Sequence, residues 1–499
     1  MRATANLPEA VESPARGNPS PRSDIAPVLR LVPTVLAAAV ALGFFVLDVT
    51  AAAGGSRDYD EGVYWQSLRS LSHGYPLFSA VFAPQGPVFF YGLLPVYALL
   101  GHSIAAARIG VALYALLAAA AIYIAASSVA GSWAGLVAVG LLTTDPIWAA
   151  EAQTLHAEVP SLALALVSVA LVTVALGRAR GSMTRTIWLA ALAGVFLALA
   201  TATKAFVVVF LVPVVLLILL GEVQRRLRMI LAGALGFAAT AIAVFLPFLG
   251  SWRLVYDDLV VSHLSAGRAM NAGLAANFRL LHLGRELPLE LAAVLVTIAA
   301  ILSGYRAILP ALAWVAVTVI ALLLYQPLFP HEVALLIPAL AFLVAVGAAP
   351  LTMLVARRRL PTIVPAIAGL AVIVVAGLAL ARDLPAWRLA AKSNPQEGQL
   401  AAAIDQALPQ GAIAIGDNPY TIALADRDTP PQLVDTSFAR VLAHTLTADD
   451  IERIATQQQV RLFLFETGRL DAVPGLRAWV AARYPQVVSR GGGTIYFLP

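Results

Sequence analysis

The segment LRLVPTVLAAAVALGFFVLDVT at residues 29–50 is followed, after AAAGGS, by the charged stretch Arg57-Asp58-Tyr59-Asp60-Glu61. The apolar segment has the roughly 20 residues that a helix needs to cross a bilayer. It is too long for a cleaved signal peptide and has the wrong flanks. The whole chain of 499 residues is 60% hydrophobic and 12% charged, with a mean hydropathy of +0.83. This composition excludes a soluble globular protein and predicts a polytopic α-helical membrane protein.

The composition also excludes several kinds of site. The chain contains no cysteine, so disulfides, thiolate metal sites and a cysteine nucleophile are absent. Its net charge is +5, but the basic residues fall largely in short loops between apolar segments, where they set membrane orientation. We therefore expect no nucleic-acid partner. Residues 1–28 are rich in Pro, Ser, Arg and Ala and predict a disordered cytoplasmic tail.

Apolar runs predict about eleven membrane spans. The run at 84–100 would be a twelfth, but counting it would place the basic clusters at 178–185, 225–228 and 357–359 outside the cell. The positive-inside rule therefore makes 84–100 a helix or re-entrant piece at the outer interface, within a first outer loop at 50–103. The predicted spans are 29–49, 104–127, 132–148, 159–177, 186–202, 204–221, 229–249, 288–304, 307–325, 332–349 and 361–381.

This topology places most other ionisable residues on the outer face. Such groups are expensive at span ends unless they line a wet or protein-buried cavity, so their gathering indicates a functional site there. The alternative is that the outer loops are simply polar. The residues concerned are Asp58, Asp60, Glu61, His73, Glu151, His156, Glu158, Lys204, His263, Arg268, His331 and Glu332.

The composition changes after Arg382, which divides a membrane domain at 29–382 from a C-terminal domain at 383–499. Strand-like runs at 412–416, 460–466 and 494–498 alternate with helical stretches at 396–408, 447–458 and 476–484. This pattern predicts a small α/β domain on the extracytoplasmic side. Thr447 followed by Asp449 and Asp450 predicts a capped helix start.

Several short motifs in the membrane part resemble those of GT-C class glycosyltransferases, namely the protein O-mannosyltransferase and aminoarabinose transferase (ArnT-like) superfamily. The resemblance lies in the order and shared outer placement of the motifs, over about residues 29–350. Two departures are Pro84-Gln85-Gly86-Pro87, where paired prolines are common, and Lys204-Ala205, where Lys-Gly is common. The motifs are Asp60-Glu61, Gly74-Tyr75-Pro76-Leu77, Pro84-Gln85-Gly86-Pro87-Val88, Ala107-Arg108-Ile109-Gly110, Asp145-Pro146, Glu151, His156-Ala157-Glu158, Thr203-Lys204-Ala205 and His331-Glu332.

The resemblance implies a GT-C-like fold and transfer of a sugar from a polyprenyl-phosphate carrier. Such transfer needs a base that takes the acceptor's proton. The candidates are the carboxylates of Asp60 and Glu61, and Asp60 is the preferred one. A cation must face the departing phosphate, and Lys204, Arg268 or a divalent metal would serve. Glu158 would hold a metal with Asp60 or orient the acceptor.

Further candidates are substrate contacts, and each has a structural alternative. Tyr59 and Tyr64 would stack on sugar or belong to an interfacial aromatic belt. His331 would contact substrate, and no spacing makes it a metal ligand. Asp60 or Glu61 would otherwise cap the helix that begins near Gly62, and Lys204 would otherwise snorkel.

The sequence therefore predicts a bacterial-type inner or plasma membrane glycosyltransferase with its site on the outer face. Its partners would be the bilayer, a polyprenyl-phosphate sugar and a protein, lipid or glycan acceptor. The main alternative is a secondary transporter or lipid flippase, and a non-catalytic scaffold is a third. Against the transporter, the charges lie at span ends rather than at the midplane, and the hydrophobic pattern has no internal repeat.

Overall fold

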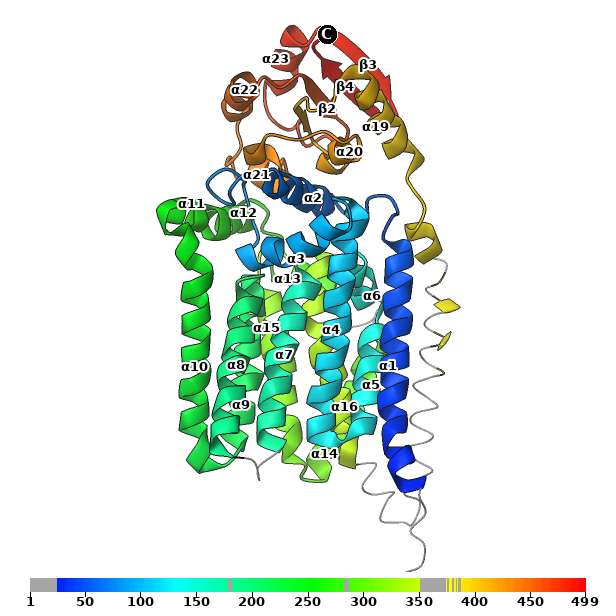
Figure 1. Cartoon of the computed structure of the whole chain (residues 1–499), viewed down its shortest axis with the longest axis vertical. Helices are drawn as coiled ribbons and strands as arrows, with labels where there is room; N and C mark the ends of the chain where they lie inside the picture. Colours follow the sequence, from blue (N-terminus) through cyan, green and yellow to red (C-terminus); the bar gives the residue numbers. More distant parts are fainter. Residues whose placement is uncertain are drawn as a thin grey trace, which may run out of the picture.

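The structure, a computed structural model, describes residues 25–177, 182–281, 287–350 and 387–499, with a few isolated positions from 374 to 384. Long helices run side by side as a bundle, and a small domain of helices and strands lies on one end of it (Figure 1). We call this end of the bundle the domain end. The predicted tail up to residue 24, the arginines at 178, 180 and 357–359, and most of the span at 361–381 lie outside the described residues.

The ten predicted spans before residue 350 each coincide with helix. Seven helices of the described part are long and apolar enough to cross a bilayer, or eight if one bent pair is a single span. The predicted spans at 204–221 and 288–304 correspond to shorter apolar helices. The bundle helices are α1 (Ile25–Ala51), α4 (Ile104–Ala130), α5 (Ser132–Thr143), α7 (Glu158–Gly177), α8 (Met183–Thr201), α9 (Leu211–Leu220), α10 (Val223–Phe245), α14 (Leu287–Leu302), α15 (Leu309–Leu324) and α16 (Ile337–Gly347).

One span is broken near the domain end. Helix α5 and the short helix α6 (Pro146–Ala152) meet at an angle of 73°. The Asp145 side chain accepts hydrogen bonds from the backbone N–H groups of Ile147 and Trp148, and Pro146 takes the first helical position. This is a strong N-terminal cap, so a new helix begins where α5 stops. The break directs the chain across the bundle and positions the polar residues that follow α6.

The first loop lies across the domain end as two helices, α2 (Tyr59–Ser72) and α3 (Pro87–Leu99) (Figure 1). Helix α3 has 13 residues. At 1.5 Å per residue it is about 20 Å long, which is shorter than the roughly 30 Å hydrocarbon core of a bilayer. Its start is fixed because the Gly86 and Val88 N–H groups donate to carbonyls of Thr203 and Ala202. The interfacial position predicted for 84–100 agrees with this arrangement.

Three further short helices, α11 (Trp252–Tyr256), α12 (Ser262–Ala269) and α13 (Leu274–Leu281), follow α10. Figure 1 shows α11 and α12 extending across the domain end. They form the long loop that the sequence placed between the spans at 229–249 and 288–304. Two irregular turns, Ala205–Phe210 and Pro330–Leu336, also reach this end of the bundle as 3₁₀ helices.

The C-terminal domain contains a four-stranded sheet with strand order β1-β2-β4-β3. The parallel pair β1 (Ala414–Gly416) and β2 (Leu462–Phe465) is joined by antiparallel β4 (Gly493–Phe497) and β3 (Gln486–Arg490). The three predicted strands are present, and β3 was not predicted because all five of its residues are exposed and lack an apolar face. The helices are α19 (Pro395–Ala407), α20 (Pro419–Leu424), α21 (Phe438–Leu442), α22 (Ala448–Gln457) and α23 (Leu476–Arg483). Helix α22 begins with the predicted cap, formed by Thr447 and Asp450.

The C-terminal domain is packed directly on α2. A Cβ atom at Gly62 would lie 2.3 Å from the Tyr420 backbone N, so only glycine allows this approach. The Trp65 and Tyr420 rings meet edge to face at 5.3 Å. Gln66 donates to the Arg427 carbonyl at 3.0 Å, and Arg69 forms ion pairs with Asp426 and Asp428. The domain is therefore attached to the first loop by close packing as well as by polar contacts.

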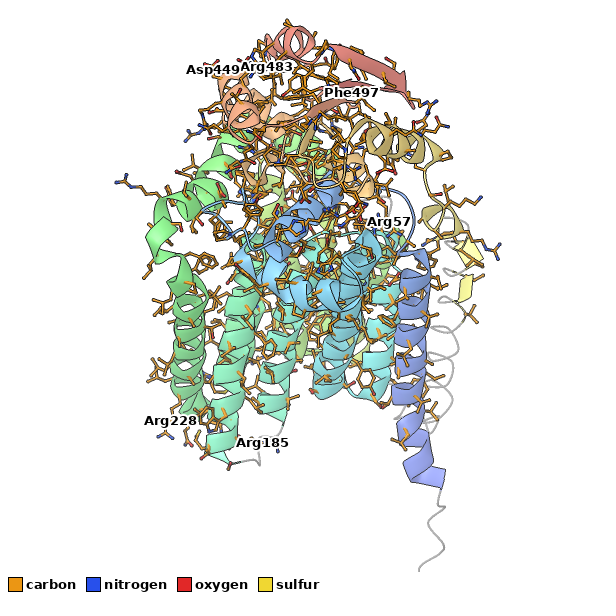
Figure 2. The ribbon with its side chains drawn as sticks, turned by 45° about the horizontal axis from the view of Figure 1, so that its top comes forward. Arg57, Arg185, Arg228, Asp449, Arg483 and Phe497 are labelled. Atoms are coloured by element: carbon orange, nitrogen blue, oxygen red, sulfur yellow. The ribbon has the colours of Figure 1, made fainter. Side chains whose placement is uncertain are left out.

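Two of the described basic residues between spans, Arg185 and Arg228, lie at the other end of the bundle. Figure 2 shows Arg185 and Arg228 together there, while Arg57 lies near the domain. This separation agrees with the partition of charge on which the predicted topology was based.

We expect Gly62→Ala to lower the free energy of unfolding by about 1–3 kcal/mol, because the added methyl group would overlap the Tyr420 backbone. The measurement is the thermal unfolding midpoint of the purified chain in detergent. Gly398→Ala in α19 is the matched control, since a Cβ atom at Gly398 meets nothing within 4 Å. Equal midpoints for the two variants would show that α2 and the domain do not pack as described.

Candidate active site

A cavity of about 410 Å³ lies between the domain end of the bundle and the C-terminal domain. Its wall combines the first loop, the turns before α9 and α16, helix α12 and the C-terminal domain. Segments that are far apart in the sequence therefore meet at one place. The polar lining residues are Asp58, Tyr59, Asp60, Tyr64, Gln85, Lys204, Ser262, His263, Tyr325, His331, Glu332, Asp435, Ser437, Arg440, Thr445 and Arg469.

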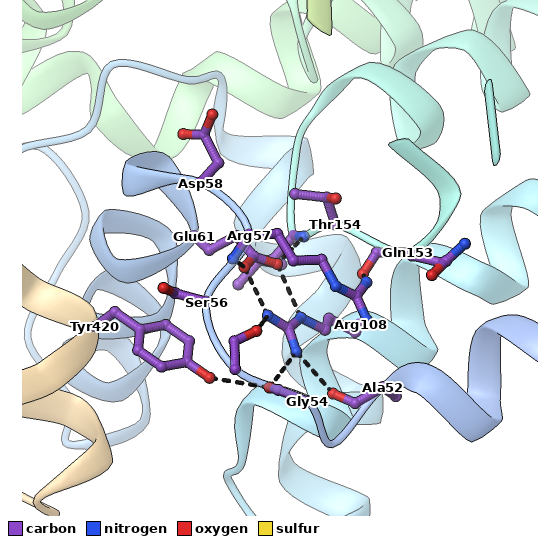
Figure 3. Close-up of polar contacts among 12 residues, drawn as sticks. Ala52, Gly54, Ser56, Arg57, Asp58, Glu61, Arg108, Gln153, Thr154 and Tyr420 are labelled. Atoms are coloured by element: carbon purple, nitrogen blue, oxygen red, sulfur yellow. Dashed lines mark hydrogen bonds and ion pairs between the residues drawn. The ribbon is translucent and has the colours of Figure 1, made fainter. Parts of the chain in front are cut away.

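Glu61 and Arg108 form a buried ion pair that fixes the start of α2. Their side chains are 0% and 1% exposed, and two N–H groups of Arg108 donate to the two oxygens of Glu61 at 2.8 and 2.6 Å. Glu61 also accepts the backbone N–H groups of Arg57 and Leu155, both at 2.9 Å. The remaining N–H groups of Arg108 reach the carbonyls of the 52–55 turn, as Figure 3 shows for Ala52 and Gly54.

The Glu61 carboxylate is thus saturated with donors and does not line the cavity. Burial alone would raise its pKa, but the charge and hydrogen bonds of Arg108 outweigh burial and lower the pKa. The prediction that Glu61 takes part in catalysis does not fit this geometry. Its place is structural, because it ties α2 to α4 and to the loop before α7.

Asp58 is the residue that caps α2. Its carboxylate accepts the Asp60 N–H at 2.8 Å and points away from the Glu61 and Arg108 pair in Figure 3. Burial alone would raise the pKa of Asp58, but the nearby positive charge of His156 keeps this pKa well below its usual range. The capping role considered for Asp60 therefore belongs to Asp58.

Asp60 lies on the cavity wall with its side chain uncommitted. No hydrogen bond or ion pair to its carboxylate is present among the residues that the structure describes. Burial, reinforced by the negative charge of Asp58, raises the pKa of Asp60 to about 7. A carboxylate with this pKa and no internal partner has the properties of a general base near neutral pH.

Two histidines meet beside Asp58. The His156 ring is 3% exposed, and its Nδ1 lies 2.8 Å from Glu151, which fixes the ring orientation. Its Nε2 is buried without a hydrogen-bond partner among the described residues and lies 3.8 Å from Asp58 Oδ1. The His156 and His331 ring centroids are 4.8 Å apart. His331 also stacks on Phe329 and approaches Glu158 at 3.5 Å.

Side chains suitable for a metal ion occur in two overlapping groups in the described part of the chain. In each group the ligand atoms lie within 4.8 Å of one another. The orphaned Nε2 of His156 fits a metal ligand, since Glu151 fixes the ring in the way that metal-binding histidines are usually held. Glu158 belongs to one group and Asp60 to neither, and His156 is the member that both groups share. The groups are Asp58, His156 and His331, and Glu151, His156 and Glu158.

Lys204 is held by two acidic side chains. Its Nζ contacts Glu158 Oε1 and lies 3.6 Å from Glu332 Oε1. Glu332 in turn accepts the Phe329 N–H at 2.9 Å, so the lysine and the 330–336 turn form one network. Lys204 therefore stands at the cavity as predicted, but its charge is compensated.

Arg268 is exposed at the end of α12 and is not among the residues that line the cavity. The prediction that it faces the donor phosphate together with Lys204 does not fit this position. The residues of α12 that do line the cavity are Ser262, His263 and Ala266. They lie on the helix face reached by i, i+1 and i+4 spacing, whereas Arg268 falls on another face.

The two predicted tyrosines both line the cavity. The Tyr59 hydroxyl lies 3.2 Å from Asp435 and accepts the Thr436 N–H at 2.8 Å, so it joins α2 to the C-terminal domain. The Tyr64 hydroxyl accepts a hydrogen bond from Gln85 at 3.0 Å. Both tyrosines therefore line the cavity, and each hydroxyl also has a structural partner.

Comparisons with known proteins agree with this geometry. Residues 84–252 match the family model described as dolichyl-phosphate-mannose-protein mannosyltransferase. The crystal structure of ArnT from Cupriavidus metallidurans bound to undecaprenyl phosphate is similar at a TM-score of 0.68 and 16% identity, over 93% of this chain and 98% of that chain. The structure of the same ArnT in the apo state is similar at a TM-score of 0.65 and 15% identity, over 93% of this chain and 97% of that chain. The chain therefore has an ArnT-like fold.

A more distant GT-C structure also matches. The archaeal oligosaccharyltransferase AglB from Archaeoglobus fulgidus, in complex with an inhibitory peptide and a dolichol-phosphate, is similar at a TM-score of 0.52 and 13% identity, over 95% of this chain and 75% of that chain. No curated protein matches the sequence of the chain. The predicted fold class is therefore confirmed by structural similarity at very low sequence identity.

The C-terminal domain supplies cavity residues that the sequence did not single out. Asp435, Arg440 and Arg469 line the cavity, yet they lie far along the chain from the other polar lining residues. No short motif marks them, because their place depends on how the domain packs on α2. Arg108 was noticed only as part of a motif, and its ion pair with Glu61 explains why an arginine stands on an otherwise apolar helix.

We expect Glu61→Gln to destabilise the chain by about 3–5 kcal/mol, because it leaves the buried Arg108 charge without its partner. Asp471→Asn is the matched control, since it breaks an exposed ion pair with Arg477 and exposed pairs contribute about 0–1 kcal/mol. Thermal unfolding in detergent measures both. A Glu61→Gln variant as stable as Asp471→Asn would contradict the structural assignment.

Proposed function

We propose that the chain is a membrane glycosyltransferase that moves a sugar from a polyprenyl-phosphate donor to an acceptor, with Asp60 as general base. The observation that carries the proposal is the uncommitted Asp60 carboxylate on the cavity wall. The GT-C fold and the mannosyltransferase family model support the reaction class. The bound undecaprenyl phosphate of the ArnT structure supports the class of donor.

The reaction needs one proton transfer and one bond exchange. An acceptor hydroxyl or amine attacks the sugar C1 carbon, and its proton passes to the Asp60 carboxylate. The bond from C1 to the phosphate oxygen breaks, and the phosphate leaves with the electron pair. Since Asp60 accepts the proton as the bond forms, its ionised form is the active one.

The surrounding residues would hold the two substrates. Glu158 orients the acceptor through the Lys204 and His331 network, and the Tyr59 and Tyr64 rings contact the sugar. A divalent ion held by Asp58, His156 and His331 would neutralise charge on the leaving phosphate.

The polyprenyl chain would lie along the bundle. An apolar groove of about 430 Å³ separates α3 from the end of α10 and is lined by Leu77, Pro87, Val88, Tyr91, Val244, Pro247 and Phe248. Isoprenoid units would be buried there at the level of the membrane interface. The acceptor would enter on the side of the C-terminal domain.

The site and the C-terminal domain would face outward from an inner or plasma membrane. Arg185 and Arg228 lie together at the opposite end of the bundle, where the positive-inside rule puts the cytoplasm (Figure 2). The acceptor would then be a protein, lipid or glycan of the cell envelope.

We expect Asp60→Asn to lower kcat/KM about 10²- to 10⁴-fold, the range attributed to general base catalysis. The assay follows labelled sugar from a panel of polyprenyl-phosphate sugars into membrane extract. Asp257→Asn, an exposed carboxylate outside the cavity, is the control. For the wild type, kcat/KM should rise with pH through about 7, since Asp60 loses its proton there, and then level off. Transfer that is indifferent to Asp60→Asn would relocate the base.

The native chain has no cysteine, so single cysteines report membrane sidedness directly. We expect Ser489→Cys in β3 to react with a membrane-impermeant maleimide added to intact cells. Gln224→Cys, exposed beside Arg225, should react only after the cells are opened. The reverse pattern would place the C-terminal domain in the cytoplasm and contradict the proposed orientation.

A further inference from the structure

We propose that Arg440 and Arg469 of the C-terminal domain bind the anionic group of a substrate in the cavity, either the phosphate of the donor or an acidic group of the acceptor. The inference rests on the proposed function, since it takes the cavity as the place of transfer. It assigns to the soluble domain a direct part in substrate binding. It also names the cations that the predicted Lys204 and Arg268 pair was expected to supply.

The membrane part of the cavity has little free positive charge. Lys204 is compensated by Glu158 and Glu332, and Arg268 lies outside the cavity. A phosphate that leaves with its electron pair needs cations that are not already paired. The lining residues that fit this requirement belong to the C-terminal domain.

Arg469 presents an unpaired guanidinium beside the proposed base. Its Cζ lies 3.9 Å from the centre of the Tyr59 ring and 5.3 Å from that of Phe438. No hydrogen bond or ion pair involves Arg469 within the described ranges of the chain. Stacking on a ring occupies the face of a guanidinium and leaves its edge N–H groups for an anion. Arg469 thus stacks on the residue that precedes Asp60 in α2, and both Arg469 and Asp60 line the cavity.

Arg440 is held on a second ring and is only partly satisfied. Its Cζ lies 3.9 Å from the centre of the Phe82 ring, and its Nη1 donates to the carbonyls of Gln432 and Asp435. Its Nε is buried and has no hydrogen-bond partner in the part of the chain described. A buried donor left unpaired is costly, so the chain itself does not fully satisfy the Arg440 guanidinium.

The acidic lining residues do not cancel these two charges by direct contact. Asp435 receives hydrogen bonds from the Tyr59 hydroxyl and the Ser437 N–H, and Asp58 caps α2. Among the described residues, no carboxylate forms an ion pair with Arg440 or Arg469. Both arginines line one cavity, and guanidinium groups pair well with a phosphate or carboxylate.

The test measures binding of a short-chain polyprenyl phosphate, with the uncharged polyprenol as reference, to the purified full chain in detergent. We expect Arg440→Gln and Arg469→Gln each to weaken phosphate binding by about 10-fold or more, with polyprenol binding unchanged. Arg483→Gln is the matched control. Arg483 also stacks on a ring of the same domain, Trp479, but lies on the part of the domain far from the bundle (Figure 2).

The outcomes separate the two sources of the anion. Weakened polyprenyl-phosphate binding assigns the arginines to the donor. Unchanged donor binding with a raised KM for the acceptor extract assigns them to an acidic acceptor. If neither quantity differs from that of Arg483→Gln, the proposal is overturned. Arg469→Gln breaks no described hydrogen bond. If the Arg440→Gln variant does not fold, the Arg469→Gln variant alone decides the test. Because the binding assay requires no turnover, it can support or overturn the role of the arginines even if the proposed sugar transfer is not observed.

Discussion

The buried ion pair between Glu61 and Arg108 is the interaction on which the rest of the site depends. A buried charge is tolerable only when its partner and its remaining hydrogen bonds are all in place. Here Glu61 has donors from Arg108 and two backbone N–H groups, and Arg108 fills its remaining positions with carbonyls of the turn before α2. Because every group is satisfied, the start of α2 has one arrangement relative to α4. That arrangement sets where Asp58 and Asp60 lie.

Helix α2 contacts both the cavity and the C-terminal domain. Tyr59, Asp60, Val63 and Tyr64 line the cavity, and Gly62, Trp65, Gln66 and Arg69 contact the C-terminal domain, as the Tyr59 hydroxyl also does. These positions follow helical spacing, so one rigid element presents both surfaces. A site carried on a helix is held more accurately than one carried on a loop. The domain and the proposed base are therefore positioned by the same fourteen residues.

The sequence was a good guide wherever one local rule decided the outcome. Apolar length gave the described helices, the positive-inside rule gave the interfacial α3, and alternation gave the strands of the C-terminal domain. These local rules failed where the role of a side chain depends on a residue from a distant segment of the chain. Glu61 and Asp60 are adjacent and chemically alike, and only Arg108 on another helix separates the structural carboxylate from the free one. His156 and His331 have no metal-binding spacing because the side chains that could hold a metal ion come from different loops.

The charges of the site show why composition alone could not identify the reacting groups. An apolar bundle admits ionisable residues only with partners, and Lys204, Glu158 and Glu332 form such a closed set at the turn ends. Such a set holds the 204 and 330–336 turns together whatever the ligand. Among the described residues, Asp60 and Arg469 have no hydrogen-bond or ion-pair partner, and Arg440 is only partly satisfied, so these are the groups whose charge can meet a substrate. Since Asp60 and the two arginines line one cavity from opposite sides, that pattern is better explained by a ligand bound between them than by chance polarity of the outer loops.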